Sequence, residues 1–189
     1  MTWLTYEPRP QDIPTAREMV EAGFTERMAR IQRVEAERHP SWPLAMDWWQ
    51  NLDTHLRMPR GLLAWSNPGV VETFTVICRR LMCWQHLPVP KGISVSPVRF
   101  VEALDLHDDE HYSQAAAAGT LFVGGVGTIK YGEDKEVERI LGLAKQRLRA
   151  GKLTLWHLDP VGTERSVDVC RRLDAHLGDA VYRVGDWGT

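Results

Sequence analysis

From residue 61 onward, short apolar runs alternate with longer stretches whose apolar residues recur at helical spacing. The short runs predict strands, and the longer stretches predict helices. The predicted strands cover residues 62–65, 93–96, 120–123, 153–158 and 180–184. The predicted helices cover residues 70–85, 114–118, 134–150 and 163–177, with a turn or helix over 97–104. Strands separated by helices indicate right-handed crossovers, so we expect a mostly parallel sheet in a three-layer α-β-α sandwich.

The first 58 residues carry no strand pattern and are predicted to form a helical extension. Thr15 and Glu18 have the spacing of a capping box, which predicts the start of a helix. Apolar residues at helical spacing predict further helices over 25–38 and 43–56. Three tryptophans are candidates for packing this extension onto the rest of the chain: Trp42, Trp48 and Trp49. We therefore divide the chain into a helical extension, residues 1–58, and an α/β core, residues 59–189.

The junction between the first strand and the first helix of the core has the layout of a phosphate-binding loop. The P-loop pattern is Gly, four residues, then Gly-Lys-Ser/Thr, and we align it with residues 66–73. Glu72 then places a carboxylate where the phosphates require a cation. Val71 places a β-branched side chain where glycine lets the backbone curl around phosphate. The positions of this degenerate nucleotide-binding loop are Ser66, Asn67, Pro68, Gly69, Glu72 and Thr73.

With these elements in order, residues 60–187 resemble the AAA+ ATPase core of the DnaC-type helicase loaders and the IstB-type transposition helper ATPases. The Leu-Leu-Leu-x-Gly-Pro-Pro-Gly-Thr-Gly-Lys-Thr stretch of that family corresponds to residues 61–73 here. Its Walker B strand, which resembles Leu-Leu-Ile-Asp-Asp-Leu-Gly, corresponds to residues 121–127. Both acidic positions of that strand are glycines in this chain, Gly124 and Gly125.

The resemblance extends to the sensor and finger positions of the family. It places Asp159 where the family has a sensor Asn. The family's Arg-Leu-x-x-Arg-Leu segment matches Arg172 at its first arginine, whereas the second, a candidate trans-acting finger, is His176 here. The chain ends after its last predicted strand, so the helical lid of AAA+ proteins is expected to be absent. Because the frame survives while the reacting positions are lost, we expect a pseudo-ATPase with no cofactor and no catalytic residues.

The amino-acid composition limits the classes of binding partner that we expect. The formal net charge is −2 and the isoelectric point about 6.4, which argues against a strongly basic nucleic-acid binder. The sequence has no apolar run of transmembrane length and no signal peptide, and its three cysteines form no CxxC motif. These features favour a cytoplasmic protein with buried, reduced thiols that does not engage membranes. The polar stretch 105–112 matches no metal-ligand spacing and is more typical of a solvated loop and helix start.

Three hypotheses for function follow. The first is a non-catalytic accessory protein of DNA replication, repair or transposition that binds a replicative helicase, an AAA+ relative or itself. The second is a nucleic-acid-binding module that contacts DNA phosphates through basic helix faces. Its candidate residues are Arg79, Arg80, Lys145 and Arg149. The third is a nucleotide-binding protein or NTPase in which Arg79, Arg80 or Lys130 replaces the missing lysine of the P-loop.

Overall fold

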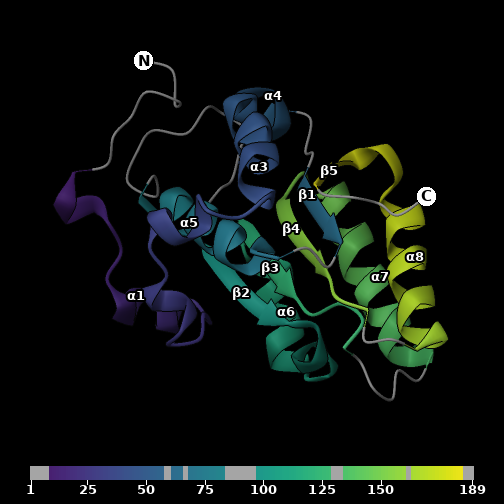
Figure 1. Ribbon diagram of the computed structural model, residues 1–189. Helices are drawn as coiled ribbons and strands as arrows, with labels where there is room; N and C mark the ends of the chain where they lie inside the picture. The colour runs from purple at the N-terminus through teal and green to yellow at the C-terminus, as the bar shows by residue number, and fades with distance from the viewer. Residues whose placement is uncertain are drawn as a thin grey trace.

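The computed structural model contains a five-stranded sheet in which every pairing is parallel (Figure 1). It describes residues 9–57, 61–65, 68–83, 97–128, 134–160 and 163–184. The strands are β1 (Gly61–Trp65), β2 (Val98–Glu102), β3 (Thr120–Gly124), β4 (Leu153–Leu158) and β5 (Val181–Val184), in the order β2-β3-β4-β1-β5. The predicted three-layer α/β sandwich is therefore confirmed.

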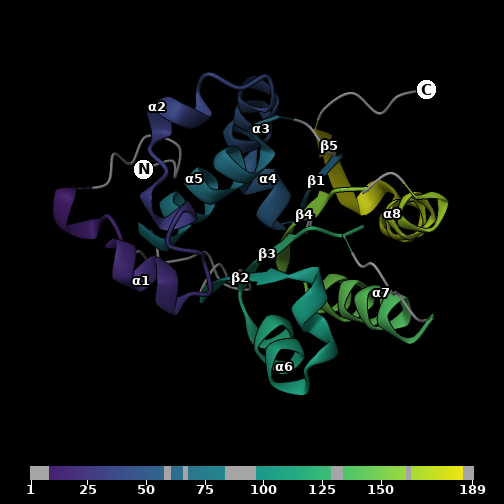
Figure 2. The same cartoon turned by 60° about the horizontal axis from the view of Figure 1, so that its bottom comes forward.

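Helices cover both faces of the sheet (Figure 2). One face packs against α3 (Ser41–Gln50) and α5 (Val70–Cys83), and the other against α6 (Asp109–Ala117), α7 (Asp134–Arg149) and α8 (Glu164–Leu177). Successive strand residues point to opposite faces, so Leu62 joins the first hydrophobic cluster and Leu63 the second. Burial on both faces explains why the strands are apolar runs without alternation. The helices predicted over 70–85, 134–150 and 163–177 are confirmed as α5, α7 and α8.

The extension is built from shorter helices than the sequence predicted. Its elements are η2 (Pro10–Asp12), α1 (Ala16–Glu21), η3 (Met28–Arg30), α2 (Arg33–Ala36), α3 and α4 (Leu52–Arg57). The capping box is confirmed, because the Thr15 hydroxyl accepts from the Glu18 amide and the Glu18 carboxylate accepts from the Thr15 amide. The continuous helix predicted over 25–38 is wrong, since Ile31 has an extended ψ of 130°. The helix predicted over 43–56 breaks at Asn51, whose side chain donates to the Asp47 carbonyl.

The extension shares its hydrophobic cluster with the α/β core. Phe24 lies 5.5 Å from Phe100 of β2, ring centroid to ring centroid. The Ala22 carbonyl accepts a hydrogen bond from the Phe100 amide at the outer edge of β2, which protects that edge from pairing with another chain. Trp48 and Trp49 are buried in the same cluster, as the sequence predicted, whereas Trp42 is half-buried.

The region around β2 is where the sequence prediction fails. The turn or helix predicted over 97–104 is wrong, because residues 98–102 form β2 and pair with β3 along the whole strand. A short 3-10 helix, η5 (Ala103–His107), follows β2. The strand predicted over 93–96 lies outside the described residues. The helix predicted over 114–118 starts earlier, at Asp109, where the Asp108 carboxylate caps its first turn.

Most apolar side chains are directed into the interior. All three cysteines are free and buried, as the sequence predicted. The large apolar side chains most exposed among the described residues are Ile13, Val20, Val34, Leu44 and Leu104. None of the helices in the described ranges has both the length and the apolar character needed to span a bilayer.

Candidate functional site

The P-loop-like turn lies at the carboxyl end of β1, where ligands of open α/β sheets bind. β1 is an inner strand between β4 and β5, and α5 begins at Val70 directly after the turn. Gly69 has a φ of 83°, a left-handed conformation that a side chain would strain. Ser66 and Asn67 lie outside the residues that the structure describes. The sequence-predicted site therefore sits where a nucleotide loop would sit, with Pro68 and Gly69 forming the turn before α5.

Residues 39–41 of the extension, here called the latch segment, lie directly on this turn. A β-carbon built on Gly69 would come within 2.0 Å of Cγ of the His39 ring. The His39 ring therefore packs on the backbone at the entry to α5. In a working P-loop this is the place where backbone amides and the helix N-terminus hold phosphate. The His39 ring thus lies against the turn at which a P-loop would hold phosphate.

Thr73 stands at the position whose hydroxyl binds Mg²⁺ in P-loop proteins. Its side chain is fully buried, and its Oγ1 lies 3.0 Å from Oγ of Ser41 in the latch segment. Ser41 Oγ is also 3.5 Å from the Pro68 carbonyl oxygen. The Thr73 hydroxyl is therefore buried against Ser41 rather than open to a metal ion. The hydroxyl instead ties the extension to the first turn of α5.

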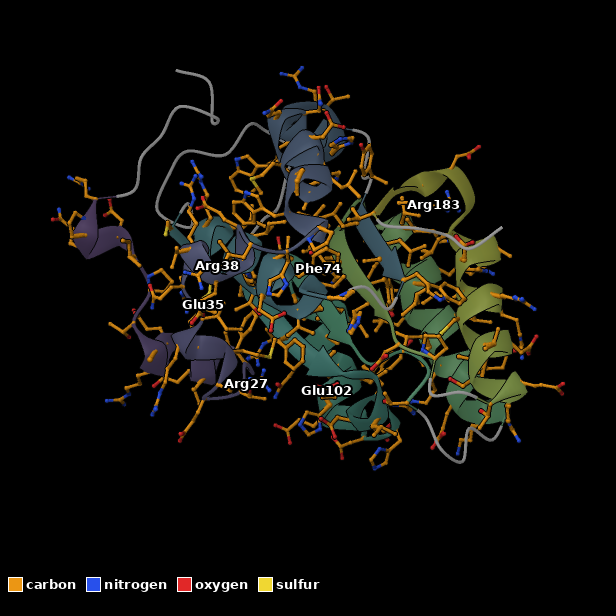
Figure 3. The ribbon with its side chains drawn as sticks, viewed as in Figure 1. Arg27, Glu35, Arg38, Phe74, Glu102 and Arg183 are labelled. Carbon is orange, nitrogen blue, oxygen red and sulfur yellow. The ribbon has the colours of Figure 1, made fainter. Side chains whose placement is uncertain are left out.

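Glu72 lies in the first turn of α5 and is half-buried. It lines a cleft of about 610 Å³ between α5 and the extension, together with Glu26, Arg27, Arg30, Ile31, Glu35 and His39. Figure 3 shows Arg27 and Glu35 on the extension beside α5. Among the described residues, none forms a hydrogen bond or an ion pair with the Glu72 carboxylate. The residue aligned with the P-loop lysine is therefore a carboxylate without a direct partner among the described residues, in a cleft that also contains Arg27 and Arg30.

The space at the two Walker B positions is filled by other side chains. Gly124 ends β3, and a β-carbon there would lie 2.9 Å from the Phe100 ring and 3.2 Å from Glu102 Oε2. A β-carbon on Gly125, whose φ is 65°, would lie 3.0 Å from the same Glu102 oxygen. An acidic side chain at either position would have to displace Phe100 or Glu102. The space beside these two glycines is therefore closed.

Glu102 is a site residue that the sequence analysis missed. It ends β2, pairs with Gly124 of β3, and stands at the carboxyl edge of the sheet (Figure 3). Burial raises the pKa of the Glu102 carboxyl, and the negative charges of Asp105 and Asp159 raise it further. None of the described side chains offers it a hydrogen bond or a cation. Its signal in the sequence was a carboxylate at the end of an apolar stretch, but residues 97–104 were predicted to form a turn or helix instead of β2.

His157 lies at the same level of the sheet. It pairs with Ala64 of β1, and along β4 it follows Trp156, which pairs with Val123 of β3. Its side chain is 9% exposed, and no described residue forms a hydrogen bond with its ring. Burial lowers the pKa of His157, although the charges of Asp159 and Glu72 oppose that shift. The ring is therefore neutral at neutral pH and faces a rim of carboxylates. We call Glu72, Glu102 and Asp159 the acidic edge.

The sensor and finger positions fall in two different places. Asp159 directly follows β4, close enough to the P-loop-like turn to influence the charge of His157. Arg172 lies on α8, across the sheet from α5, and forms an ion pair of 2.9 Å with Glu138 of α7. His176 is exposed on the same helix. The structure thus brings Asp159 to the site, whereas Arg172 and His176 lie on the opposite face.

The four candidate DNA contacts also divide into two groups. Arg79 donates hydrogen bonds to the carbonyl oxygens of Ala29 and Ile31, and Arg80 stacks 5.0 Å above the ring centre of Trp49. Both side chains therefore hold the extension against α5. The second group is exposed on α7 and consists of Lys145 and Arg149. Lys130, the remaining candidate cation for a substituted P-loop, lies outside the described residues.

Neither metal ligands nor known relatives assign a further role to the site. Within the described ranges, no three His, Cys, Asp or Glu side chains gather closely enough to hold a metal ion. Protein-family models give no match to the chain, and curated proteins give none either. The interpretation of the site therefore rests on its geometry and its charges.

Proposed function

We propose that the protein is a catalytically inactive, AAA+-like accessory protein that acts by binding another protein rather than by turning over nucleotide. One observation carries this proposal. The latch segment packs His39 on the P-loop-like turn and binds the Thr73 hydroxyl through Ser41. Two separate requirements for a nucleotide, space at the loop and a free hydroxyl for Mg²⁺, are thereby removed by the chain itself.

The charge of the site supports the same proposal. Phosphoryl-transfer sites surround the phosphates with lysine, arginine and Mg²⁺, because the triphosphate is strongly negative. Here Glu72 replaces the P-loop lysine, and Glu102 is half-buried close to the Walker B positions. Carboxylates in a partly desolvated edge repel phosphate more strongly than they would in water. A nucleotide would meet repulsion where it needs attraction.

The order of the strands is a third line of support. β1, which precedes the P-loop-like turn, and β3, which ends at the Walker B position, are not neighbours in the sheet. β4, which precedes Asp159, lies between them. Both common doubly wound orders place β1 next to β2, whereas β3 and β4 separate these strands here. The sheet is all-parallel and covered by helices on both faces, which is compatible with the P-loop-like frame on which the resemblance rests.

The assignment to DNA replication, repair or transposition is an analogy with helicase loaders and transposition helpers. A fold that has lost its nucleotide chemistry can keep the surfaces by which its relatives bind each other and their helicases. The expected partner is a replicative helicase, an active AAA+ relative or a second copy of this chain. A nucleic-acid role has less support, because Arg79 and Arg80 are committed to the extension.

The experiment that tests the proposal is ATP hydrolysis combined with thermal unfolding at millimolar Mg-ATP. A ligand present at about 100 times its Kd would stabilise the fold by about 2.7 kcal/mol. We expect no turnover and no change in the unfolding temperature. Thr73→Val is the matched variant, and Mg-ATP should likewise give no turnover with it and leave its own unfolding temperature unchanged. Turnover or stabilisation that Thr73→Val abolishes would show a working site and reject the proposal.

A further inference from the structure

We infer that the hollow between α1 and the start of β2 binds a short extended segment of the protein partner, which adds to the outer edge of the sheet. The inference deepens the proposed function and rests on it, because it names the kind of partner segment that this surface fits. The hollow has a volume of about 280 Å³. We call it the edge groove, and its walls include Ile13, Glu18, Glu21, Met82 and Val98. α1 lies beside β2 in both views of the ribbon (Figures 1 and 2).

The first observation is a pair of backbone groups at the edge of the sheet. The Pro97 carbonyl accepts a hydrogen bond from the Thr120 amide, so the peptide groups of residue 97 face β3. The Phe100 amide donates on the opposite side, to the Ala22 carbonyl. Because peptide groups alternate between the two sides of a strand, Val98 presents its amide and its carbonyl outward, as Phe100 does. Among the described residues, no backbone group pairs with Val98 on that side.

The second observation limits the length of the segment that can pair there. An exposed donor and acceptor at a sheet edge form a template for another strand. The extension closes this edge at Phe100, since a β-carbon built on Gly23 would come within 2.4 Å of the Phe100 carbonyl oxygen. The whole edge of another sheet, such as that of a second copy, therefore cannot pair along β2. One residue of an antiparallel segment can still exchange two hydrogen bonds with Val98.

The side chains of the edge groove favour an aliphatic residue at this point. Val98 belongs to the hydrophobic cluster on the α5 face of the sheet. Residues that lie opposite each other in a ladder share a face, so the incoming side chain would lie on the Met82 side. Ile13 forms a further apolar wall and is 46% exposed, and covering it would remove apolar surface from water. A valine fits this place and also favours an extended backbone.

Charge around the edge groove favours basic neighbours for that aliphatic residue. Among the described residues that line it, three are carboxylates and one is a guanidinium: Asp12, Glu18, Glu21 and Arg99. Asp12 and Glu21 have arginine partners that are themselves exposed, and surface pairs of this kind contribute little. The carboxylates therefore remain able to attract a cation from another molecule. The segment that fits best is extended, with lysine or arginine on both sides of an aliphatic residue.

The test is an NMR titration of the labelled full chain with the peptide acetyl-Lys-Val-Lys-amide. We expect saturable shifts at the Val98 amide and at the methyl groups of Ile13 and Met82, with a millimolar Kd. Two isomeric peptides carry one methyl group on a backbone nitrogen, either that of the valine or that of the second lysine. Methylation at the valine removes the donor to the Val98 carbonyl and should weaken binding about tenfold. The second lysine nitrogen faces away from β2, so its methylation should change the Kd less than about twofold.

A matched pair of protein variants tests the apolar wall. Ile13→Ser should weaken binding of the unmethylated peptide about threefold, because less apolar surface is buried. Val34→Ser is the control, since Val34 lies on α2 outside the edge groove and is 54% exposed. It should leave the Kd unchanged. Added salt should weaken binding to both proteins, because the lysines act through exposed charges.

Four results would each overturn the inference. They are equal effects of the two methylations, no saturable shift at Val98, unchanged binding by Ile13→Ser, and shifts at Val98 that follow protein concentration without peptide, which would place a second copy there. A titration of the same protein with Mg-ATP, observed at the amides of Gly69 and Gly124, tests the proposed function separately. If neither ATP nor the peptide shifts its signals, the inference fails while the proposed function stands. If ATP shifts Gly69 and Gly124, the proposed function fails, whatever the peptide does.

Discussion

The two ends of the sheet differ in whether their buried charged groups have hydrogen-bond partners. At the amino end, Arg147 is 1% exposed and donates to five acceptors. These are the Thr154 hydroxyl and the carbonyl oxygens of Ala115, Ala118, Gly119 and Leu153, at 2.7 to 3.4 Å. At the carboxyl end, the Glu102 carboxylate and the His157 ring have no hydrogen-bond partner among the described residues. The buried charge at the amino end is therefore fully hydrogen-bonded, whereas this carboxylate and this imidazole at the carboxyl end are not.

This difference distinguishes a buried group that serves the fold from groups that are available to a ligand. Burial lowers the pKa of Arg147 to about 9, so the side chain still carries its charge at neutral pH, and its acceptors all belong to the fold. A group that is satisfied in this way has no capacity for an outside ligand. The carboxyl end keeps unsatisfied groups that destabilise the fold, which is the usual mark of a binding site. The following predictions test this contrast, in order of decreasing effect.

Arg147→Met should be the most destabilising substitution at either end. It removes the donors of five acceptors around a buried side chain, so we expect a loss of about 3–5 kcal/mol. The free energy of unfolding in urea measures the loss. Arg149→Met, on the exposed side of the same helix, is the control and should change stability by less than about 0.5 kcal/mol. Equal effects of the two substitutions would contradict the contrast.

Gly124→Asp should destabilise the protein by about 2–3 kcal/mol instead of restoring a Walker B carboxylate, because it overpacks β3 against Phe100 and brings a second charge to Glu102. Gly142→Asp on α7 carries the same side chain where the nearest obstacle is the Tyr112 hydroxyl at 3.5 Å. That control should stay within about 0.5 kcal/mol of the wild type. Both values come from chemical denaturation. If Gly124→Asp left the free energy of unfolding unchanged, the space beside Gly124 would be open.

Ser41→Ala should destabilise the protein by about 1–2 kcal/mol, because it leaves the buried Thr73 hydroxyl without its partner. Thr73→Val removes the other hydroxyl of the pair. In a double-mutant cycle, the two changes together should cost less than the sum of the single changes. Ser113→Ala, on the exposed side of α6, serves as the control for loss of a hydroxyl. Strict additivity would show that the latch segment does not depend on this hydrogen bond.

Glu102→Gln should stabilise the protein by about 1 kcal/mol at neutral pH, since it removes an unpaired, half-buried charge. The folded-state pKa of Glu102 is raised, so its ionisation lowers stability as pH rises from the ordinary value of about 4.5 through the raised value. The gain of the variant should therefore vanish below the ordinary pKa. Thermal unfolding of both proteins across acidic and neutral pH measures this difference. A gain that persists at the acid end would point to packing rather than charge.

The sequence predicted the long helices better than it predicted β2, the strand at the edge of the sheet. The helices that became α7 and α8 carried long amphipathic patterns, and such patterns reflect local burial on one face. The sequence predicted a turn or helix where β2 lies, because β2 is decided by pairing with β3, a contact between separate segments that local patterns do not encode. The helix predicted over 25–38 failed for a similar reason, since Arg79 binds the carbonyl oxygens of Ala29 and Ile31 from α5.

The site shows the same division between local and distant information. The substitutions at Glu72, Gly124 and Gly125 were visible in the sequence, because motif positions are local. Their replacement by other groups was not, since the latch segment reaches Thr73 across a separation of 32 residues. Glu102 was missed because its role depends on standing beside Gly124 in the sheet. Departures from a motif can thus be identified in the sequence, whereas the side chains that pack around those positions are known only from the fold.

The most direct test of the central claim is a calorimetric titration of the full chain with Mg-ATP and Mg-ADP at millimolar concentration. The latch segment and the acidic edge together predict no binding heat beyond dilution. Ser41→Gly, which frees the Thr73 hydroxyl, should not create binding, because the charge of Glu72 remains. Micromolar binding by the wild type that Thr73→Val abolishes would contradict the account, and the P-loop-like turn would then be a working variant of the nucleotide site.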